Sequence, residues 1–391
     1  MIKLLKYHLL IADSMYVSDV EAIPLHRELD GRFANAQKWI DSREYCLVRI
    51  TTNEGVVGWG ECWGPTSGNQ EIIEEYVAPW LIGRDPRNVE QIHDELHFKL
   101  QSSYHSYVPV SVISGVDIAL WDCYGRSLDT SVGRLLGGKR RDSVPAYATG
   151  HFFPDVETLD HFIETVIQEA RGNVANGFEA LKVKIGVSRH FPWGIDADLE
   201  IMSAIRDEVG DEVRLMADAN HAYDVADARR VARRLEDLDV YFFEEPVEPQ
   251  FIKDYATLNQ EVDIPIAGGE CWAFAHEFDR IFEQEAVSYA QPDVTSAGGI
   301  TSMRRIASLA DANNIQTLPH VFGSVVALAA SLQILSTIPG KPMVEFDRTP
   351  NPIRDELSVE PITNDGPVVH VPEGPGLGIE IDPEVLDEFR K

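Results

Sequence analysis

The sequence predicts an α/β protein in which a TIM-type (β/α) barrel follows a smaller α+β domain. The chain has 391 residues, of which 44% are hydrophobic, so it can hold one large domain and a smaller one. Short strand-like runs alternate with helix-like runs from residue 140 onward. Ionisable residues stand at the ends of most of these strands, which is where such a barrel carries its chemistry.

The front of the chain predicts strands followed by helices. The stretch "YCLVRITTNEGVVGWGE" (45–61) has alternating runs around an Asn-Glu-Gly turn, which is typical of an antiparallel hairpin. Apolar residues in "ISGVDIALWDCYGRSLD" (113–129) recur at a helical period. The Gly- and charge-rich stretch "LLGGKRRDSV" (135–144) then interrupts the pattern and marks the expected domain boundary.

The barrel is expected over residues 140–350. Helix-like segments such as 196–210 and 223–238 lie between strand-like runs, as repeated βα units require. A doubly wound sheet is the alternative, but no Gly-rich phosphate loop follows any strand. The eight predicted strands are 144–150, 179–186, 212–220, 240–246, 264–270, 287–293, 315–320 and 342–347.

The charge balance excludes some partners. The chain has 64 acidic and 34 basic residues, a net charge of −30, and only ten lysines. Such a surface argues against nucleic acid or an anionic membrane as partner. It keeps a protein soluble and is also typical of adaptation to high salt, so we expect a halophilic source.

The sequence indicates a cytoplasmic protein. No apolar run approaches transmembrane length, and the N-terminal "KLLKYHLLIA" contains Lys6 and His8 and lacks a small-residue cleavage site. The cysteines are far apart and form no CxxC pair, so neither a disulfide framework nor a zinc ribbon is predicted. They are Cys46, Cys62, Cys123 and Cys271.

Three carboxylates at strand ends predict a metal site. Asp218, Glu244 and Glu270 are spaced 26 residues apart, one βα unit per step. On adjacent strands of a barrel they converge and would repel one another unless a cation lay between them. A set of carboxylates without Cys or His suits Mg²⁺ best. Glu245 points to the opposite face and is a weaker candidate, whereas Asn220 shares a face with Asp218.

Other ionisable residues surround this group. In "EALKVKIG" (179–186), Lys182 and Lys184 point the same way from one strand. The sixth strand ends at Asp293, the seventh at His320, and the eighth carries Glu345. Alone, each would be read as a helix cap, a surface charge or a structural histidine. Their coincidence at one end of a barrel predicts an active site.

These motifs resemble those of the enolase superfamily, in particular its mandelate racemase-like subgroup. The motifs are "KVK" (182–184), "DAN" (218–220), "EEP" (244–246), "GGE" (268–270), "PD…GGIT" (292–301), "LPH" (318–320) and "VEF" (344–346). The front motifs "GWGEC", "DIALWD" and "LLGGKRRDSVPAY" extend the resemblance over nearly the whole chain. It implies that residues 1–135, completed by 355–391, form a capping domain.

The resemblance also implies roles for the site residues. Asp218, Glu244 and Glu270 would ligate one Mg²⁺. Lys184 would be one acid/base catalyst, and Lys182 would favour its neutral amine. His320 would be the second catalyst, oriented by Asp293, and Glu345 would donate a hydrogen bond to the substrate. We expect Asn220, His221, Trp63 and His26 to bind substrate, with specificity set by loops 15–35, 60–68, 151–155 and 188–194.

The expected reaction begins with removal of the proton α to a carboxylate. We favour dehydration of an acid sugar, an aldonate or aldarate, through a metal-stabilised enediolate to a 2-keto-3-deoxy acid. The same residues would also support racemisation or epimerisation of a 2-hydroxy acid. A non-catalytic sugar-acid binding protein would need neither Lys184 nor His320. Muconate-type cycloisomerisation is disfavoured, because that subgroup has a lysine where Asp293 stands. The expected partners are a small carboxylate substrate and further copies of the chain.

Overall fold

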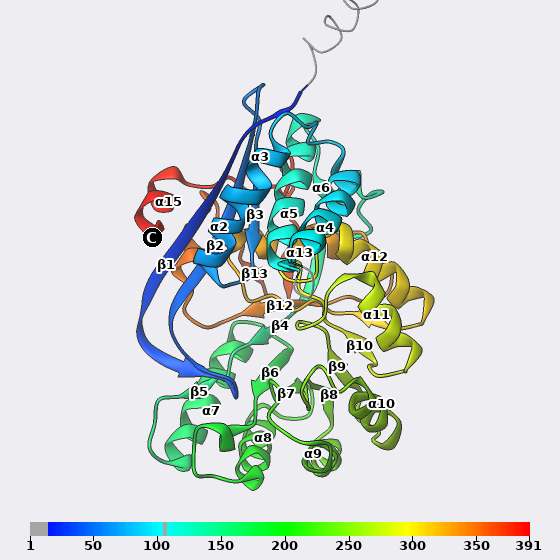
Figure 1. Ribbon diagram of the computed structural model, residues 1–391. Helices are drawn as coiled ribbons and strands as arrows, with labels where there is room; N and C mark the ends of the chain where they lie inside the picture. The colour runs from blue at the N-terminus through cyan, green and yellow to red at the C-terminus, as the bar shows by residue number, and fades with distance from the viewer. Residues whose placement is uncertain (1–14, 105–107) are drawn as a thin grey trace, which may run out of the picture.

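The computed structural model describes residues 15–104 and 108–391, and it confirms the predicted fold class. Figure 1 shows an antiparallel sheet and its helices standing above a ring of parallel strands wrapped by helices. The segment "KLLKYHLLIA" lies outside the described residues. Among the residues that are described, no helix is both long and apolar enough to cross a membrane.

A long hairpin dominates the first domain. Strand β1 (Val17–Ala34) pairs antiparallel with β2 (Trp39–Thr52), and β2 pairs with β3 (Val57–Cys62) across the predicted turn. The far end of β1 pairs with β5 (Phe153–Pro154), which follows the first barrel strand. The turn between β1 and β2 is therefore held against the barrel (Figure 1).

Helices pack on one face of this sheet. They are α2 (Thr66–Ile72), a π-helical turn (Ile73–Val77), α3 (Ala78–Leu81), α4 (Val89–Tyr104), α5 (Val110–Ser127) and α6 (Val132–Leu135). The predicted helix 113–129 is α5, which begins three residues earlier. Because α5 is covered by the sheet on one side and by α4 and the barrel helix α12 (Gly299–Ala312) on others, every residue from Val112 to Cys123 is buried.

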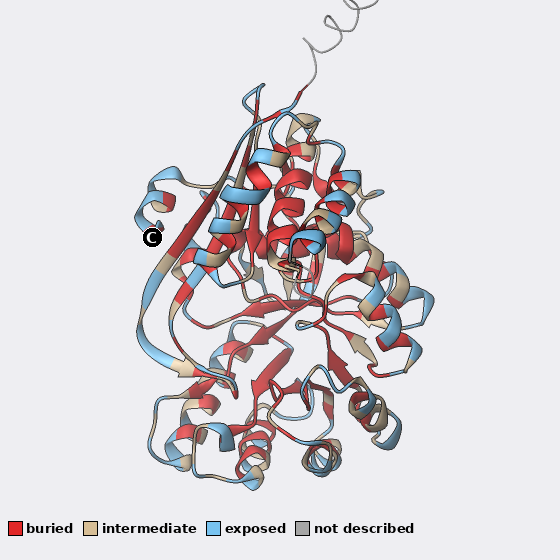
Figure 2. Cartoon of the chain, in the orientation of Figure 1, coloured by how far each residue is buried: buried red, intermediate tan, exposed pale blue. Residues whose placement is uncertain are grey.

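The second domain contains all eight predicted barrel strands. Neighbouring strands pair in parallel from β4 to β11, and β12 pairs in parallel with β4 on the side away from β6. Figure 2 shows these strands as almost continuously buried, as expected for a parallel sheet covered by helices. The strands are β4 (Ser143–Thr149), β6 (Ala180–Lys184), β7 (Arg214–Asp218), β8 (Val240–Glu244), β9 (Ile266–Gly268), β10 (Tyr289–Ala290), β11 (Gln316–Thr317) and β12 (Val344–Asp347).

A helix follows each of the first seven barrel strands. The predicted helices 196–210 and 223–238 are α8 and α9, each within two residues of its expected bounds. The last strand is followed only by the short α14 (Pro352–Glu356). The seven helices are α7 (Leu159–Ala175), α8 (Ile195–Val209), α9 (Val225–Asp237), α10 (Ile252–Glu261), α11 (Phe274–Glu283), α12 (Gly299–Ala312) and α13 (Val325–Leu335).

The C-terminal segment touches both domains. Strand β14 (Val368–His370) pairs with the barrel strand β4 and with β13 (Asn364–Asp365), whereas α15 (Pro383–Phe389) packs beside β1 (Figure 1). Gly376 forms a backbone bridge with Ser131. The assignment of 355–391 to the capping domain stays a prediction, because this segment links the two domains.

The close contact between β3 and α5 depends on glycine. A Cβ added at Gly60 would lie 1.9 Å from the carbonyl oxygen of Gly115 and 2.8 Å from the amide nitrogen of Ala119. Both contacts are with helix backbone, which cannot rotate away as a side chain can. The backbone of β3 therefore lies directly against the backbone of α5, with no side chain between them at Gly60.

We expect Gly60→Ala to lower the free energy of unfolding by about 3 kcal/mol, because the added methyl group forces sheet and helix apart. Urea denaturation would measure the change. Gly172→Ala is the matched control, since Gly172 lies within α7 with nothing near its added Cβ, and it should stabilise the protein by about 0.5–1 kcal/mol. Equal stability of the two variants would contradict the argument.

Candidate active site

The predicted site residues meet at the C-terminal ends of the barrel strands. A pocket of about 190 Å³ lies there and is lined by residues of the barrel and of the capping domain. Lys182, Asp218 and Glu244 are almost completely buried behind its wall, where Lys182 contacts Glu345 and Asp218 contacts Lys184. The predicted residues that line the pocket are Trp63, Lys184, Asn220, Glu270, Asp293, His320 and Glu345.

Lys182 connects three carboxylates. Its Nζ lies 2.8 Å from Glu244 Oε1, 2.7 Å from Glu345 Oε1 and 3.6 Å from Asp218 Oδ2. Although burial lowers the pKa of Lys182, the charges of Glu244 and Glu345 outweigh it and hold the pKa well above its usual value. Lys182 therefore stays charged and neutralises the carboxylates around it.

Lys184 contacts Asp218, the carboxylate at the end of the next strand. Its Nζ donates a hydrogen bond to Asp218 Oδ2 and lies 5.0 Å from the centre of the Phe152 ring. Burial and Lys182 lower the pKa of Lys184, but the charge of Asp218 raises it above its usual value. The structure thus differs from the expectation that Lys182 keeps Lys184 neutral, because Asp218 lies closer to Lys184 and has the opposite sign.

The three predicted metal ligands are crowded and incompletely satisfied. Burial and the charge of Asp218 raise the pKa of Glu244, although the charge of Lys182 acts in the opposite direction. Glu244 Oε2 also accepts a hydrogen bond from Gln291 at 2.6 Å. Glu270 Oε2 is buried and has no hydrogen-bond partner among the described residues. Crowded carboxylates that include a buried oxygen without a hydrogen-bond partner are a donor set that suits a hard divalent cation.

His320 and Asp293 form a closely paired dyad. Nδ1 of His320 donates to Asp293 Oδ2 at 2.7 Å, and Nε2 lies 3.4 Å from Glu270 Oε2. Thr295 holds the other oxygen of Asp293 with its amide and its hydroxyl, each at 2.6 Å. Burial lowers the pKa of His320, but Glu270, Glu345 and Asp293 together raise it to about 10. His320 is therefore an imidazolium at neutral pH, and Asp293 fixes its orientation.

Glu345 accepts hydrogen bonds rather than donating them. Its carboxylate accepts from the hydroxyl of Thr149 at 2.5 Å and from the amide of Val321 at 3.2 Å. Burial raises the pKa of Glu345, but Lys182 and His320 lower it further, to about 2. The expected role of Glu345 as a donor to substrate differs from this arrangement, because an ionised carboxylate has no proton to donate.

The capping domain holds the loop that follows His320. Glu61, from β3, accepts hydrogen bonds from the amide and hydroxyl of Ser324 and from the amide of Ala327, at the start of α13. Burial raises the pKa of Glu61 to about 7, although these hydrogen bonds lower it. The sequence did not predict that Glu61 holds this loop. The motif "GWGEC" contains Glu61, but it gives no information about which residues Glu61 contacts.

The pocket wall combines residues that sequence reasoning missed with two of the four predicted substrate-binding residues. Trp63 and Asn220 line the pocket as predicted. The other two predicted residues, His221 and His26, do not line the pocket. His26 lies on β1, and its ring nitrogens are 2.9 Å from Glu44 and 3.0 Å from Glu28. Asn35 and Phe152 also line the pocket and lie in the predicted loops 15–35 and 151–155, whereas the missed lining residues include Gln37, Lys38, Ile40 and Phe322. The polar run that joins two strand patterns in "FANAQKW" was the available signal.

We expect Asp293→Asn to lower the pKa of His320 from about 10 toward its ordinary value, since a negative charge 2.7 Å from the ring is removed. NMR titration of the imidazole, assigned with His320→Asn, would measure it. Asp365→Asn is the control, because Asp365 pairs with His370 at 3.7 Å on the surface and solvent screens that pair. An unchanged His320 pKa in Asp293→Asn would contradict the dyad.

Comparison with known proteins agrees with the family that the sequence motifs resemble, and the matches cover both domains. Residues 165–385 match the family "Enolase C-terminal domain-like", and residues 26–137 match "Mandelate racemase / muconate lactonizing enzyme, N-terminal domain". The chain is 38% identical to D-galactarolactone cycloisomerase of Agrobacterium fabrum, over 96% of this chain and 99% of that one. It is 33% identical to arabinonate dehydratase of Saccharolobus solfataricus, over 89% and 91%.

A solved structure supports the fold. It is L-talarate dehydratase from Polaromonas, complexed with Mg and L-glucarate, with a TM-score of 0.84 and 27% identity. The match covers 97% of this chain and 98% of that one. With both domains matched and the site motifs in place, the chain belongs to the enolase superfamily and is mandelate racemase-like.

Proposed function

We propose that the protein removes the α-proton of an acid sugar and expels the β-oxygen, which yields a 2-keto-3-deoxy acid. The observation that carries this proposal is the placement of Lys184 and His320 in one pocket with the carboxylates between them. In strand order, Asp218, Glu244 and Glu270 stand at the ends of β7, β8 and β9, between β6 with Lys184 and β11 with His320. A substrate over the carboxylates would have a proton-transfer group on each side.

Asp218, Glu244 and Glu270 would hold one Mg²⁺. When bound, this ion would stabilise the negative charge that develops on the substrate carboxylate. The carboxylates now attract Lys182, Lys184 and His320, so a cation would compete with these groups for them. A cation bound to Asp218 would reduce the attraction between Asp218 and the Lys184 ammonium group, and the pKa of Lys184 would fall. Lys184 could then lose its proton, and its neutral amine could accept the α-proton.

His320 suits the role of general acid. Besides Glu270, the charges of Glu345 and Asp293 raise the pKa of His320 and favour its imidazolium form, and these two charges would remain beside it when Mg²⁺ is bound. Its Nδ1 is held by Asp293, so Nε2 carries the proton that can be transferred. Protonation of a β-hydroxyl by Nε2 would expel water. Racemisation would instead need His320 to return a proton to the α-carbon, and to act as a base in the reverse direction. A charged imidazolium favours elimination.

A second candidate reaction differs only in the oxygen that leaves. When the β-oxygen belongs to a lactone ring, the same elimination opens the ring and releases no water, so the product is an isomer. The 38% identical relative named as a D-galactarolactone cycloisomerase favours this candidate. The relatives named as dehydratases favour loss of water. Both candidates use Lys184 and His320 in the same roles.

A substrate screen separates the two reactions. Aldonates, aldarates and their lactones would be incubated with the protein and Mg²⁺, and products analysed by mass spectrometry. Dehydration lowers the mass by one water, whereas ring opening leaves it unchanged. Because the net charge of −30 predicts a halophilic source, the screen includes low and high salt. Solvent deuterium exchange at the α-carbon without further product would favour the racemase, and no turnover or exchange would favour a binding protein.

Variants of Lys184 and His320 should lose different steps of the reaction. We expect Lys184→Ala to lose both turnover and α-proton exchange with D₂O by at least about a hundredfold. His320→Asn should lose turnover while Lys184 still exchanges the α-proton, since that step precedes elimination. Calorimetry should show Mg²⁺ binding in both. His26→Asn is the control, because His26 lies outside the pocket. Full turnover in Lys184→Ala would contradict the mechanism.

A further inference from the structure

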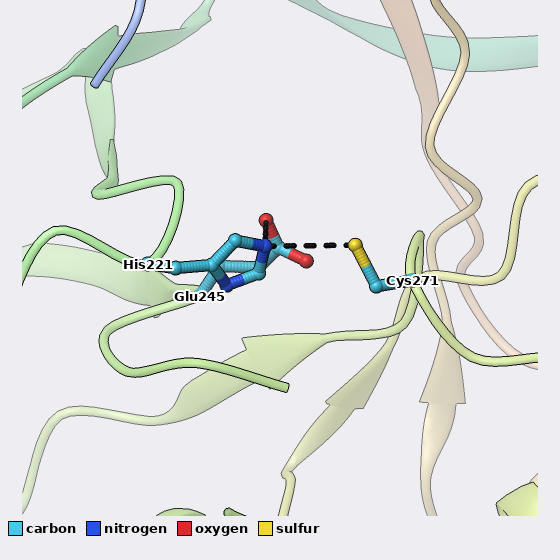
Figure 3. A group of neighbouring side chains, drawn as sticks. All are labelled: His221, Glu245 and Cys271. Atoms are coloured by element: carbon cyan, nitrogen blue, oxygen red, sulfur yellow. Dashed lines mark hydrogen bonds and ion pairs between the residues drawn. The ribbon is translucent and has the colours of Figure 1, made fainter. Parts of the chain in front are cut away.

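Three side chains beside the predicted magnesium ligands form a second, compact cluster of a different chemical kind. The cluster consists of His221, Glu245 and Cys271, and each member follows a predicted ligand by one to three positions. One ligand atom from each residue lies within 4.8 Å of the other two. Figure 3 shows the imidazole beside the carboxylate and the thiol facing the imidazole nitrogen.

Local backbone conformation turns these side chains away from the carboxylate triad. His221 has φ 65° and Glu245 has φ 44°, both in the left-handed region that side chains other than glycine seldom adopt. Each lies just beyond the end of its barrel strand, so the alternation of the strand no longer applies to it. The two strands therefore direct Asp218 and Glu244 to one site and His221 and Glu245 to another.

The hydrogen bond of His221 to the main chain determines which ring nitrogen is free. Nδ1 lies 3.1 Å from the carbonyl oxygen of Val247, which can only accept, so Nδ1 carries a hydrogen. Nε2 then faces Glu245 Oε2 at 3.0 Å and Cys271 Sγ at 3.5 Å. A histidine anchored through one N–H to a backbone carbonyl, with its other nitrogen directed at a carboxylate and a thiol, has the usual orientation of a metal ligand.

One oxygen of the Glu245 carboxylate lacks a hydrogen-bond partner among the described residues, although the thiol of Cys271 is a hydrogen-bond partner of this carboxylate. The exposed fraction of Glu245 is 1%, and its Oε2 has no hydrogen-bond donor among the described residues unless the Nε2 of His221 is protonated. A buried carboxylate oxygen that faces an imidazole lone pair needs a proton or a cation between them. This free oxygen points to a ligand for the cluster.

We propose that His221, Glu245 and Cys271 bind a transition metal ion of the Zn²⁺ class, at a site separate from the predicted magnesium site. One nitrogen, one oxygen and one sulfur ligand are the set that Zn²⁺ accepts and Mg²⁺ does not. In a tetrahedral zinc site the nitrogen and sulfur ligands are about 3.5 Å apart, which agrees with the 3.5 Å between Nε2 and Sγ. On binding, the thiol proton would leave to solvent.

The site would retain one open coordination position. Three protein ligands leave the fourth position of a tetrahedral ion to water or to another oxygen ligand. Cys271 is exposed and lines the substrate pocket together with Glu270 and Asn220. A metal ion held by Cys271 would therefore lie at the wall of that pocket, beside the substrate.

Cobalt titration tests the proposal. The full chain, saturated with Mg²⁺, would be titrated with Co²⁺ and followed by absorption, because sulfur-to-cobalt charge transfer reports thiolate ligation directly. We expect one Co²⁺ per chain with this band, which Zn²⁺ displaces and further Mg²⁺ does not. A wild-type protein without the band, or a band removed by Mg²⁺, would overturn the proposal. His221, Glu245 and Cys271 would then be joined only by hydrogen bonds.

Variants identify the ligands. Cys271→Ser should abolish the band, and it should weaken Zn²⁺ binding by more than about a hundredfold, since loss of an outer partner alone costs about 10–100-fold. His221→Asn should weaken Zn²⁺ binding while Mg²⁺ binding, measured by calorimetry, stays unchanged. Cys123→Ala is the matched control, because Cys123 is buried within α5, and its band should equal that of the wild type. A band that survives in Cys271→Ser would place the thiolate elsewhere and overturn the assignment.

Discussion

The arrangement of the active site depends on the charge balance around Lys182. This side chain is fully buried, and its ammonium group contacts Glu244 and Glu345 directly and lies 3.6 Å from Asp218. Removal of one partner from such a group leaves an uncompensated buried charge, which typically costs about 3–5 kcal/mol. The three carboxylates can therefore converge in the interior only because a permanent positive charge lies among them. A second cation, bound on the pocket side, would meet carboxylates that are already positioned.

The capping domain supports the same site from the opposite direction. Glu61 holds the start of α13 through Ser324 and Ala327, and the loop before Ser324 carries His320 and Phe322. The pairing of β1 with β5 anchors the turn that carries Asn35, Gln37 and Lys38. The pocket is thus built by both domains, although every group proposed for proton transfer comes from the barrel.

The sequence predicted the eight barrel strands and the residues at their ends, because strand period and one-unit spacing are local patterns. It did not predict which partner each charge takes. Lys184 was expected to be neutral, but the strand register places Asp218 beside it. His26 was expected at the substrate, but it lies opposite Glu44 in the β1–β2 ladder and pairs with it there. Such contacts depend on register and on left-handed residues at strand ends, neither of which a single sequence specifies.

The hairpin of β1 and β2 gives the pocket a wall that is independent of the catalytic strands. Asn35, Gln37 and Lys38 lie in a turn, where changes in side-chain size and charge disturb no barrel ladder. A substitution in this turn would therefore change the wall of the pocket and leave the proposed proton-transfer groups and their charge balance in place. Pocket shape and proton transfer are thus carried by separate parts of the chain, and the first can be altered without the second.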